Sequence, residues 1–209
     1  MKEKVAAEEE EEEVTSSEEK ATTVTRLIVK CLENEGVKYV FGIPGEENIH
    51  FIDALNGSSS IRFILVHHEQ AASFMADMYG RVTGKAGVCS ATLGPGAINL
   101  LLGTADAHTD SVPLVAISAQ VGLNREYKET HQFVDLVSMF KPVTKWAAEI
   151  KIPSAVPEMV RKAFKVAQTE RPGSCYLGVP QDLEEMSVSS SLRPLLRSEV
   201  YDSAPSPSQ

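Results

Sequence analysis

Short apolar runs without a charged residue alternate along this chain with segments of helical periodicity. Three of these runs span residues 86–91, 113–118 and 174–179. A strand that is apolar on both faces has to be covered on both faces, as in a parallel sheet, whereas a half-exposed antiparallel strand alternates polar and apolar residues. The chain is therefore predicted to be an α/β protein with a doubly wound, mostly parallel sheet and helices on both faces.

The order of the helices and strands follows from the same patterns. Thr23 can cap a helix over residues 24–31 that Gly36 closes, and Pro157 fits the first turn of a late helix. Further strands are expected at residues 37–42 and 61–66, with an extended segment at 143–146. The other helices are expected at residues 48–55, 69–82, 96–107, 133–139 and 157–168.

Composition divides the chain into three parts. Residues 1–21 form an acidic arm with an unbroken run of glutamates and no aromatic residue, which predicts disorder. A solubilising extension is the favoured role of this arm, and a partner-binding tail is the alternative. Residues 22–186 are predicted to form the folded domain, followed at 187–209 by a tail or linker rich in Ser and Pro.

Charge and hydropathy exclude several classes of protein. The formal net charge is −9, and the acidic arm contributes most of it. The remainder is only mildly acidic, so a basic nucleic-acid surface is not expected. No apolar run approaches the ~20 residues of a membrane span, and the N-terminus has neither an apolar signal segment nor the composition of a transit peptide. We therefore expect a cytoplasmic protein with no nucleic-acid or membrane partner.

The three cysteines predict buried free thiols. Cys31, Cys89 and Cys175 are far apart, each lies in an apolar run, and no CxxC spacing occurs. Neither a disulfide framework nor a zinc site is expected, which fits a reducing compartment. No metal site formed by this chain alone is predicted.

A glycine-rich segment, Gly94-Pro95-Gly96-Ala97-Ile98-Asn99, follows the strand expected at 86–91. A dinucleotide-binding turn is disfavoured, because Asn99 occupies the third glycine position and no acidic residue ends the next strand, where Gln120 follows Ala119. Taken alone, the segment is better explained as a tight strand-to-helix turn.

Glu69 lies where an apolar strand is expected to pass into a helix of small residues. An exposed carboxylate favoured by the helix dipole is the ordinary explanation for a lone glutamate at a helix start. Here Ile64-Leu65-Val66 precedes it and Ala71-Ala72 follows it. These apolar neighbours favour a buried, crowded carboxylate that can exchange a proton with a ligand.

Three short segments fall at the ends of expected strands, and in a parallel sheet ligands lie beyond the carboxyl ends of the strands. They are Gly42-Ile43-Pro44-Gly45, then His67-His68-Glu69-Gln70, then residues 94–99; a fourth segment, Thr130-His131-Gln132, follows a polar loop and is continued by residues 141–146. In this order they resemble the pyrimidine-binding domain of thiamine-diphosphate enzymes, and most closely that of the acetolactate synthases. The resemblance covers about residues 22–186.

The resemblance implies a role for Glu69 and for the turns around it. In the family, the glutamate protonates the N1′ atom of the aminopyrimidine, so that the 4′-amino group can take the proton from C2. The resemblance assigns to the cofactor pocket Gly42, Pro44, Gly45, Gly94, Pro95, Gly96 and Asn99. For the turn at 42–45, a purely conformational role is equally consistent. The resemblance places Gln132 on the substrate side, together with His131 and His68. For His67 and His68, a packed structural histidine is an equally good explanation.

The resemblance also implies what the cofactor requires beyond these residues. Complete enzymes of this kind hold Mg²⁺ and the diphosphate with a Gly-Asp-Gly motif, which this sequence lacks. We therefore expect half a site, completed by a homo-oligomer or a partner chain, which would convert pyruvate to acetolactate. FAD binding stays open, and His131-Gln132 is nearer to the catabolic than to the anabolic enzymes. The alternative is a non-catalytic interaction module, regulatory or a relic, with the same fold.

Overall fold

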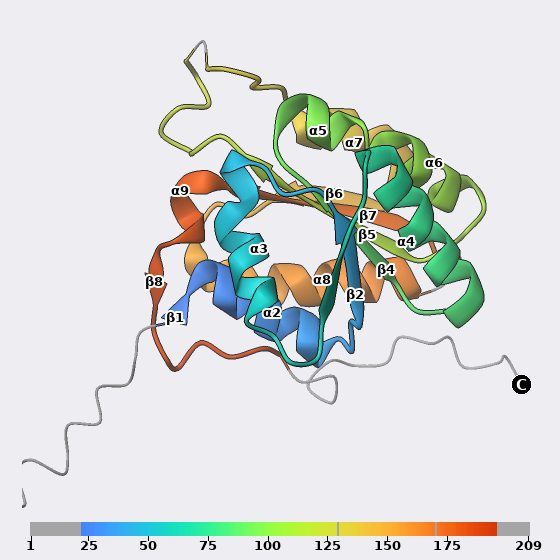
Figure 1. Ribbon diagram of the computed structural model, residues 1–209, viewed down its shortest axis with the longest axis horizontal. Coiled ribbons are helices and arrows are strands. Elements are labelled where there is room, and N and C mark those ends of the chain that lie inside the picture. Colours follow the sequence, from blue (N-terminus) through green and yellow to red (C-terminus); the bar gives the residue numbers. More distant parts are fainter. Residues whose placement is uncertain (1–21, 129, 170, 196–209) are drawn as a thin grey trace, which may run out of the picture.

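The computed structural model describes residues 22–128, 130–169 and 171–195, and the predicted acidic arm at 1–21 lies outside this range. At its centre is a six-stranded sheet in which every pairing is parallel, in the order β3-β2-β4-β5-β7-β6 (Figure 1). The strands are β2 (Tyr39–Gly42), β3 (Arg62–Leu65), β4 (Gly87–Ala91), β5 (Leu114–Gln120), β6 (Trp146–Glu149) and β7 (Ser174–Pro180). The predicted α/β fold with a parallel sheet is confirmed.

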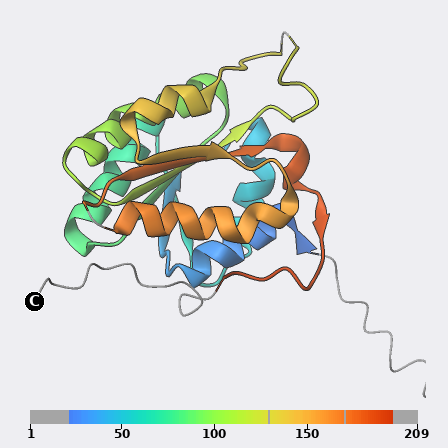
Figure 2. The same cartoon turned by 180° about the vertical axis from the view of Figure 1, so that it is seen from behind.

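Helices cover both faces of this sheet, as Figures 1 and 2 show. One face carries α2 (Val24–Asn34), α3 (Ile49–Asn56) and α8 (Val156–Gln168). The other face carries α4 (Glu69–Thr83), α5 (Gly94–Ile98), α6 (Leu101–Thr109) and α7 (Leu136–Phe140). The doubly wound arrangement predicted from the apolar runs is therefore present.

Alternate residues of the central strands pack into two separate cores. On β5, Val115 and Ile117 face the core beneath α2 and α8, while Leu114 and Ala116 face the core beneath α4 and α6. All four side chains are at most 1% exposed. Burial on both faces explains why these strands show no polar alternation.

The helix starts predicted at Thr23 and Pro157 are confirmed. The Thr23 hydroxyl accepts a hydrogen bond from the Arg26 N–H at 3.3 Å, which satisfies one of the free donors at the start of α2. Gly36, just beyond this helix, adopts a φ of 80° that favours glycine. Pro157 lies in the first turn of α8.

The single helix predicted at 96–107 is wrong, because the structure has two helices there, α5 and α6. Asn99 ends α5, and its side-chain amide bonds away from the helix to the Glu69 carboxylate. Side-chain periodicity alone cannot reveal this break, since residues on both sides of it are apolar and helical.

Two further boundaries differ from the predicted ones. The extended segment predicted at 143–146 begins too early, because Val143 belongs to the 3₁₀ turn η2 (Lys141–Val143) and β6 begins only at Trp146. The helix predicted at 133–139 begins at Leu136, because the Asp135 carboxylate caps it by accepting from the Ser138 N–H at 2.9 Å. The other short turns are η1 (Glu46–Asn48) and η3 (Pro153–Ala155).

The two described ends of the domain pair with each other. After α9 (Gln181–Glu184), β8 (Ser187–Val188) forms a separate antiparallel sheet with β1 (Thr22–Thr23). The Asn34 side-chain amide also donates to the Leu195 carbonyl at 2.9 Å. The first residues of the predicted tail at 187–209 therefore contact the domain, and residues 196–209 lie outside the described range.

The three cysteines are buried and free, as predicted. Burial raises the pKa of the Cys31 and Cys175 thiols to about 12, so they stay protonated at neutral pH. None of the helices in the described part of the chain combines the length and the apolar character of a membrane span. The same part of the chain has no group of three or more His, Cys, Asp or Glu side chains placed to hold a metal ion.

Candidate functional site

The predicted site residues meet at the carboxyl edge of the sheet. From β2 the chain passes to β3 on one side, and it then returns to form β4 on the other side of β2. The adjacent ends of β2 and β4 therefore mark a topological switch point, where open α/β sheets bind their ligands. The turn at 42–45 follows β2, Glu69 follows β3, and residues 94–99 follow β4.

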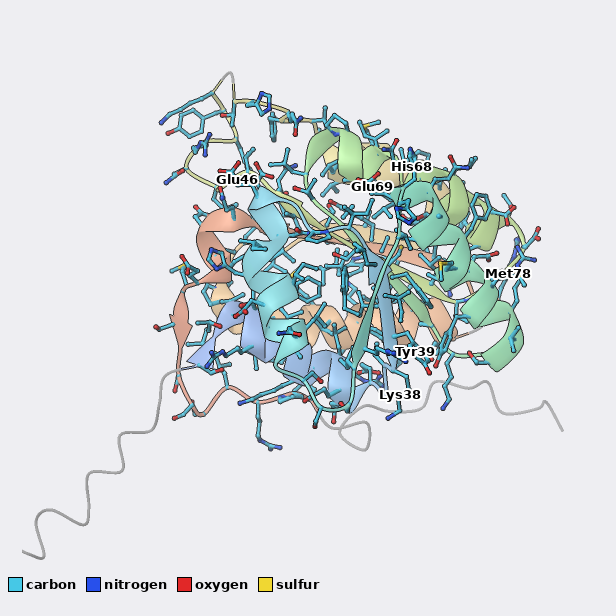
Figure 3. The ribbon with its side chains drawn as sticks, viewed as in Figure 1. Lys38, Tyr39, Glu46, His68, Glu69 and Met78 are labelled. Atoms are coloured by element: carbon cyan, nitrogen blue, oxygen red, sulfur yellow. The ribbon has the colours of Figure 1, made fainter. Side chains whose placement is uncertain are left out.

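Glu69 is the first residue of α4 and is held by the glycine-rich turn (Figure 3). Its Oε2 atom accepts a hydrogen bond from the Asn99 side-chain amide at 3.0 Å. A Cβ atom added to Gly96 would lie 3.4 Å from Glu69 Oε1. The glycine therefore leaves space beside the second carboxylate oxygen. The predicted burial is wrong in degree: Glu69 is half-buried, because it begins a helix at the rim of the sheet.

The other end of the glycine-rich turn contacts the loop that carries Gln132. Gly94 has a φ of 55°, and a Cβ atom there would collide with the Gln132 carbonyl oxygen. Glycine is required here both for its conformation and for the close approach of the two backbones. The structure thus brings together two segments that are far apart in the sequence.

The turn after β2 packs against the end of β4. A Cβ atom on Gly45 would lie 2.6 Å from the Cβ of Thr92, and one on Gly42 would collide with the Ser90 carbonyl. The Gly45 N–H donates to the Asn48 side-chain oxygen at 2.6 Å, and the Asn48 amide donates back to the Ile43 carbonyl at 3.2 Å. Gly42 therefore serves strand packing, whereas Gly45 and the exposed Pro44 shape the rim.

Sequence reasoning missed Thr92 and Glu47. Thr92 lies directly after β4 and touches both turns, since its methyl group is 2.8 Å from where a Cβ on Gly96 would be. Its hydroxyl donates to Glu47 Oε2 at 2.8 Å. A polar residue immediately after a buried apolar strand is a signal that could have identified Thr92. Glu47 carries no comparable signal, because acidic residues are common in exposed turns.

The three residues assigned to the substrate side differ in their contacts. His68 caps α4, and its Nδ1 atom accepts from the Gln70 N–H at 3.1 Å. Its ring is therefore used, in part, to start the helix. Gln132 has a φ of 57° and an exposed side chain, and His131 beside it is also exposed.

A groove of about 410 Å³ adjoins the pair formed by Glu69 and Asn99. Gln70 and Asn99 provide polar groups at this groove, and its other walls are almost entirely apolar. Its apolar lining residues are Ile98, Leu101, Leu102, Ala105, Met139 and Val143. An apolar cleft with a few placed polar groups is typical of small-molecule sites.

A larger cavity of about 700 Å³ lies between α3 and the edge strand β3. Its walls include His50, Asp53 and Arg62, but none of the predicted site residues. We locate the candidate site at the strand ends rather than here, because a carboxylate, an amide and two glycine turns converge at the strand ends.

The family of this domain follows from comparison with known proteins. Residues 22–139, more than half of the chain, match the model of the family described as thiamine pyrophosphate enzyme, N-terminal TPP binding domain. The chain belongs to this family. Its parallel sheet is the scaffold on which this thiamine pyrophosphate enzyme domain places Glu69 and the other predicted site residues.

Relatives of this thiamine pyrophosphate enzyme domain carry consistent names. The catabolic acetolactate synthase of Raoultella terrigena is 45% identical over 179 residues, which cover 86% of this chain and 32% of that protein. The acetolactate synthase large subunit of Haemophilus influenzae is 43% identical, over 75% of this chain and 27% of the relative. The acetolactate synthase of Bacillus subtilis is 41% identical, with the same shares covered. The chain thus spans about a third or less of the length of these relatives.

Proposed function

We propose that this domain binds the aminopyrimidine of thiamine diphosphate and that Glu69 is the group that activates the cofactor. The observation that carries the proposal is the fixed carboxylate: Asn99 holds Oε2 at 3.0 Å, while Gly96 leaves space beside Oε1. A carboxylate oriented in this way can share a proton with a ring nitrogen at hydrogen-bond distance. The donor set therefore fits the pyrimidine half of the cofactor.

The remaining predicted residues have supporting roles in this proposal. The walls of the pocket are formed by the backbone turns that contain Gly42, Pro44, Gly45, Gly94 and Pro95. In this proposal, one side of the ring lies against the apolar groove beside Asn99. Gln132, His131 and His68 lie on the substrate side. When bound, thiamine diphosphate supplies the nucleophilic carbon and the electron sink for reactions of 2-oxo acids.

The overall reaction that we propose is that of an acetolactate synthase, in which two molecules of pyruvate give acetolactate and CO₂. The names of the relatives support it, and so does the sequence that follows Gln132. The reaction also requires Mg²⁺ and a diphosphate site, which we assign to a domain or partner chain bearing the Gly-Asp-Gly motif. We further propose a cytoplasmic location.

An exposed apolar face on α4 supports assembly with such a partner. Met75, Met78 and Val82 are 40%, 54% and 79% exposed, and with Phe74 and Tyr79 they line a shallow apolar groove. Figure 3 shows Met78 on the outer side of this helix. Because patches of this kind are rarely left in water, we propose that the face is covered in a homo-oligomer or by the partner that carries the diphosphate site.

Acetolactate formation from pyruvate tests the proposed reaction. The full chain would be assayed with thiamine diphosphate and Mg²⁺, alone and mixed with a chain that carries the Gly-Asp-Gly motif. We expect turnover only in the mixture and its loss in Glu69→Gln. Glu158→Gln, an exposed glutamate at the start of α8, is the matched control. Undiminished turnover by Glu69→Gln would exclude the proposed role.

A further inference from the structure

The loop between β5 and α7 is fastened to the domain at two places. One is the contact between the Gln132 carbonyl and Gly94 described above. At the other, the loop residue Glu126 meets Glu149 at the end of the edge strand β6, and Lys151 bonds to both carboxyl groups. The distance from Lys151 Nζ to Glu126 Oε1 is 2.8 Å. We call the cluster Glu126–Glu149–Lys151 the loop latch.

The two carboxyl groups of the latch are neighbours, because Lys151 Nζ bonds to an oxygen of each. An ionised carboxylate has no donor, so a hydrogen bond between these two groups requires that one of the glutamates keeps its proton. The Glu149 side chain is 6% exposed and that of Glu126 is 29% exposed. Glycine at position 178 allows this burial, since a Cβ atom there would lie 3.1 Å from Glu149 Cγ.

We propose that Glu149 is a positioning residue whose proton, shared with Glu126, closes the loop over the site and whose loss releases it. In the closed state Glu149 donates to Glu126, and Lys151 balances the remaining negative charge. After ionisation, two adjacent carboxylates compete for one lysine, and their repulsion acts on the loop. The residue that the loop presents to the site is Gln132. The consequence for substrate rests on the proposed function, whereas the latch itself does not.

The charged and titratable groups around the latch set the direction of this switch. Burial, followed by the hydrogen bond with Glu126, raises the pKa of Glu149 to about 7, and Lys151 opposes the rise. The hydrogen bond with Glu149 lowers the pKa of Glu126. The other groups that face the pair are Asp135, on the loop side, and the buried Tyr176 hydroxyl on β7, which hydrogen-bonds with Ser118 at 2.8 Å. The proton therefore resides on Glu149, and the latch opens as the pH rises through about 7.

Amide hydrogen exchange of the full chain, without cofactor, tests the latch. The loop amides of Arg125, Lys128 and Phe133 donate to loop carbonyls and report on its opening. After correction for intrinsic exchange, we expect their protection to fall several-fold from about pH 5.5 to about pH 8.5, while amides of β5 stay unchanged. In Glu149→Gln, whose amide can donate to Glu126 at any pH, the loop should stay protected throughout.

A second variant distinguishes a latch held by a shared proton from one held by a simple ion pair. Lys151→Gln removes the cation that favours ionised Glu149, so we expect the midpoint of the loop transition to move to higher pH. Glu158→Gln should behave as the unmodified chain. Unchanged loop protection across neutral pH, the same pH dependence in Glu149→Gln, or a lower midpoint in Lys151→Gln would each overturn the proposal. Because no cofactor is present, failure here leaves the role of Glu69 untouched.

Discussion

Glu69 and Glu149 lie at the same carboxyl edge of one sheet, yet their surroundings are opposite in kind. Glu69 begins a helix, is half-buried, and has a neutral amide on one oxygen and the space left by Gly96 beside the other. Glu149 ends a strand, is 6% exposed, and is enclosed by a second carboxyl group and Lys151. The first has one oxygen beside the space at Gly96, whereas the second is bonded entirely within the protein.

This difference shows that position at a strand end does not by itself make a glutamate part of a binding site. The deciding factor is whether the neighbours leave one oxygen accessible in a fixed direction. The loop that carries Gln132 contacts both regions, through Gly94 at one end and Glu126 at the other. Variants in the two regions should therefore give separable effects, and the loop should be the only place where the effects meet.

Glu69→Gln should have the largest effect and should leave the stability of the domain nearly unchanged. Loss of a group that exchanges a proton lowers rates by roughly 10²–10⁴-fold. The measurement is acetolactate formation by the mixture with a Gly-Asp-Gly partner, with denaturant unfolding of the same variant alongside. If Glu69→Gln lost folded protein to the same extent as activity, its effect would be one of stability, and Glu69 would no longer differ from Glu149 in this respect.

Gly94→Ala should destabilise the domain by about 2–4 kcal/mol, because the cost of a left-handed conformation is added to the cost of a collision with the Gln132 backbone. Gly84→Ala is the matched control: Gly84 has a φ of 68° but nothing within 4 Å of an added Cβ. Its cost should be limited to about 1–2 kcal/mol. Urea unfolding gives both values, and equal costs would show that the contact with Gln132 contributes nothing.

The free energy of unfolding should depend on pH through Glu149. The unfolded chain releases this proton near pH 4.5 and the folded chain near pH 7, so the folded state holds more protons between these values. The stabilising contribution is complete below about 4.5 and is lost as the pH rises through about 7. Relative to Glu149→Gln, the loss should be on the order of 1–3 kcal/mol in urea unfolding. If the free energy of unfolding changed with pH in the same way in the unmodified chain and in Glu149→Gln, Glu149 would not be the group that titrates.

Asn99→Ala should have the smallest effect of the four. It removes one hydrogen bond to Glu69, which is worth about 0.5–1.5 kcal/mol, or roughly 2–12-fold in cofactor affinity. Calorimetric titration with thiamine diphosphate and Mg²⁺ in the partner mixture measures it, and Asn56→Ala, at an exposed asparagine of α3, is the control. An affinity that falls equally in both variants would show that Asn99 does not orient Glu69.

The sheet, most helices and the strand-end location of Glu69 could be predicted from sequence because each depends on local patterns. Unbroken apolar runs specify buried parallel strands, and Thr23 and Pro157 mark helix starts through their own backbone chemistry. The family resemblance supplied the expected roles of the turns. None of this required knowledge of which segments touch.

The features that sequence reasoning missed all depend on contacts between distant segments. The break between α5 and α6 accompanies the bond from Asn99 to Glu69, and the latch joins residues 126 and 149. Thr92 matters because it touches two turns at once. Glu69 is likewise half-buried because it lies at the rim of the sheet, whereas its flanking apolar residues predicted a buried side chain.

The binding of the cofactor at Glu69 is tested most directly by NMR, which maps where the free aminopyrimidine binds on the full chain. We expect shifts concentrated at the amides of Glu69, Gly96 and Asn99, and their loss in Glu69→Gln but not in Glu149→Gln. Shifts confined to the cavity between α3 and β3, or shifts that persist unchanged in Glu69→Gln, would contradict binding at Glu69.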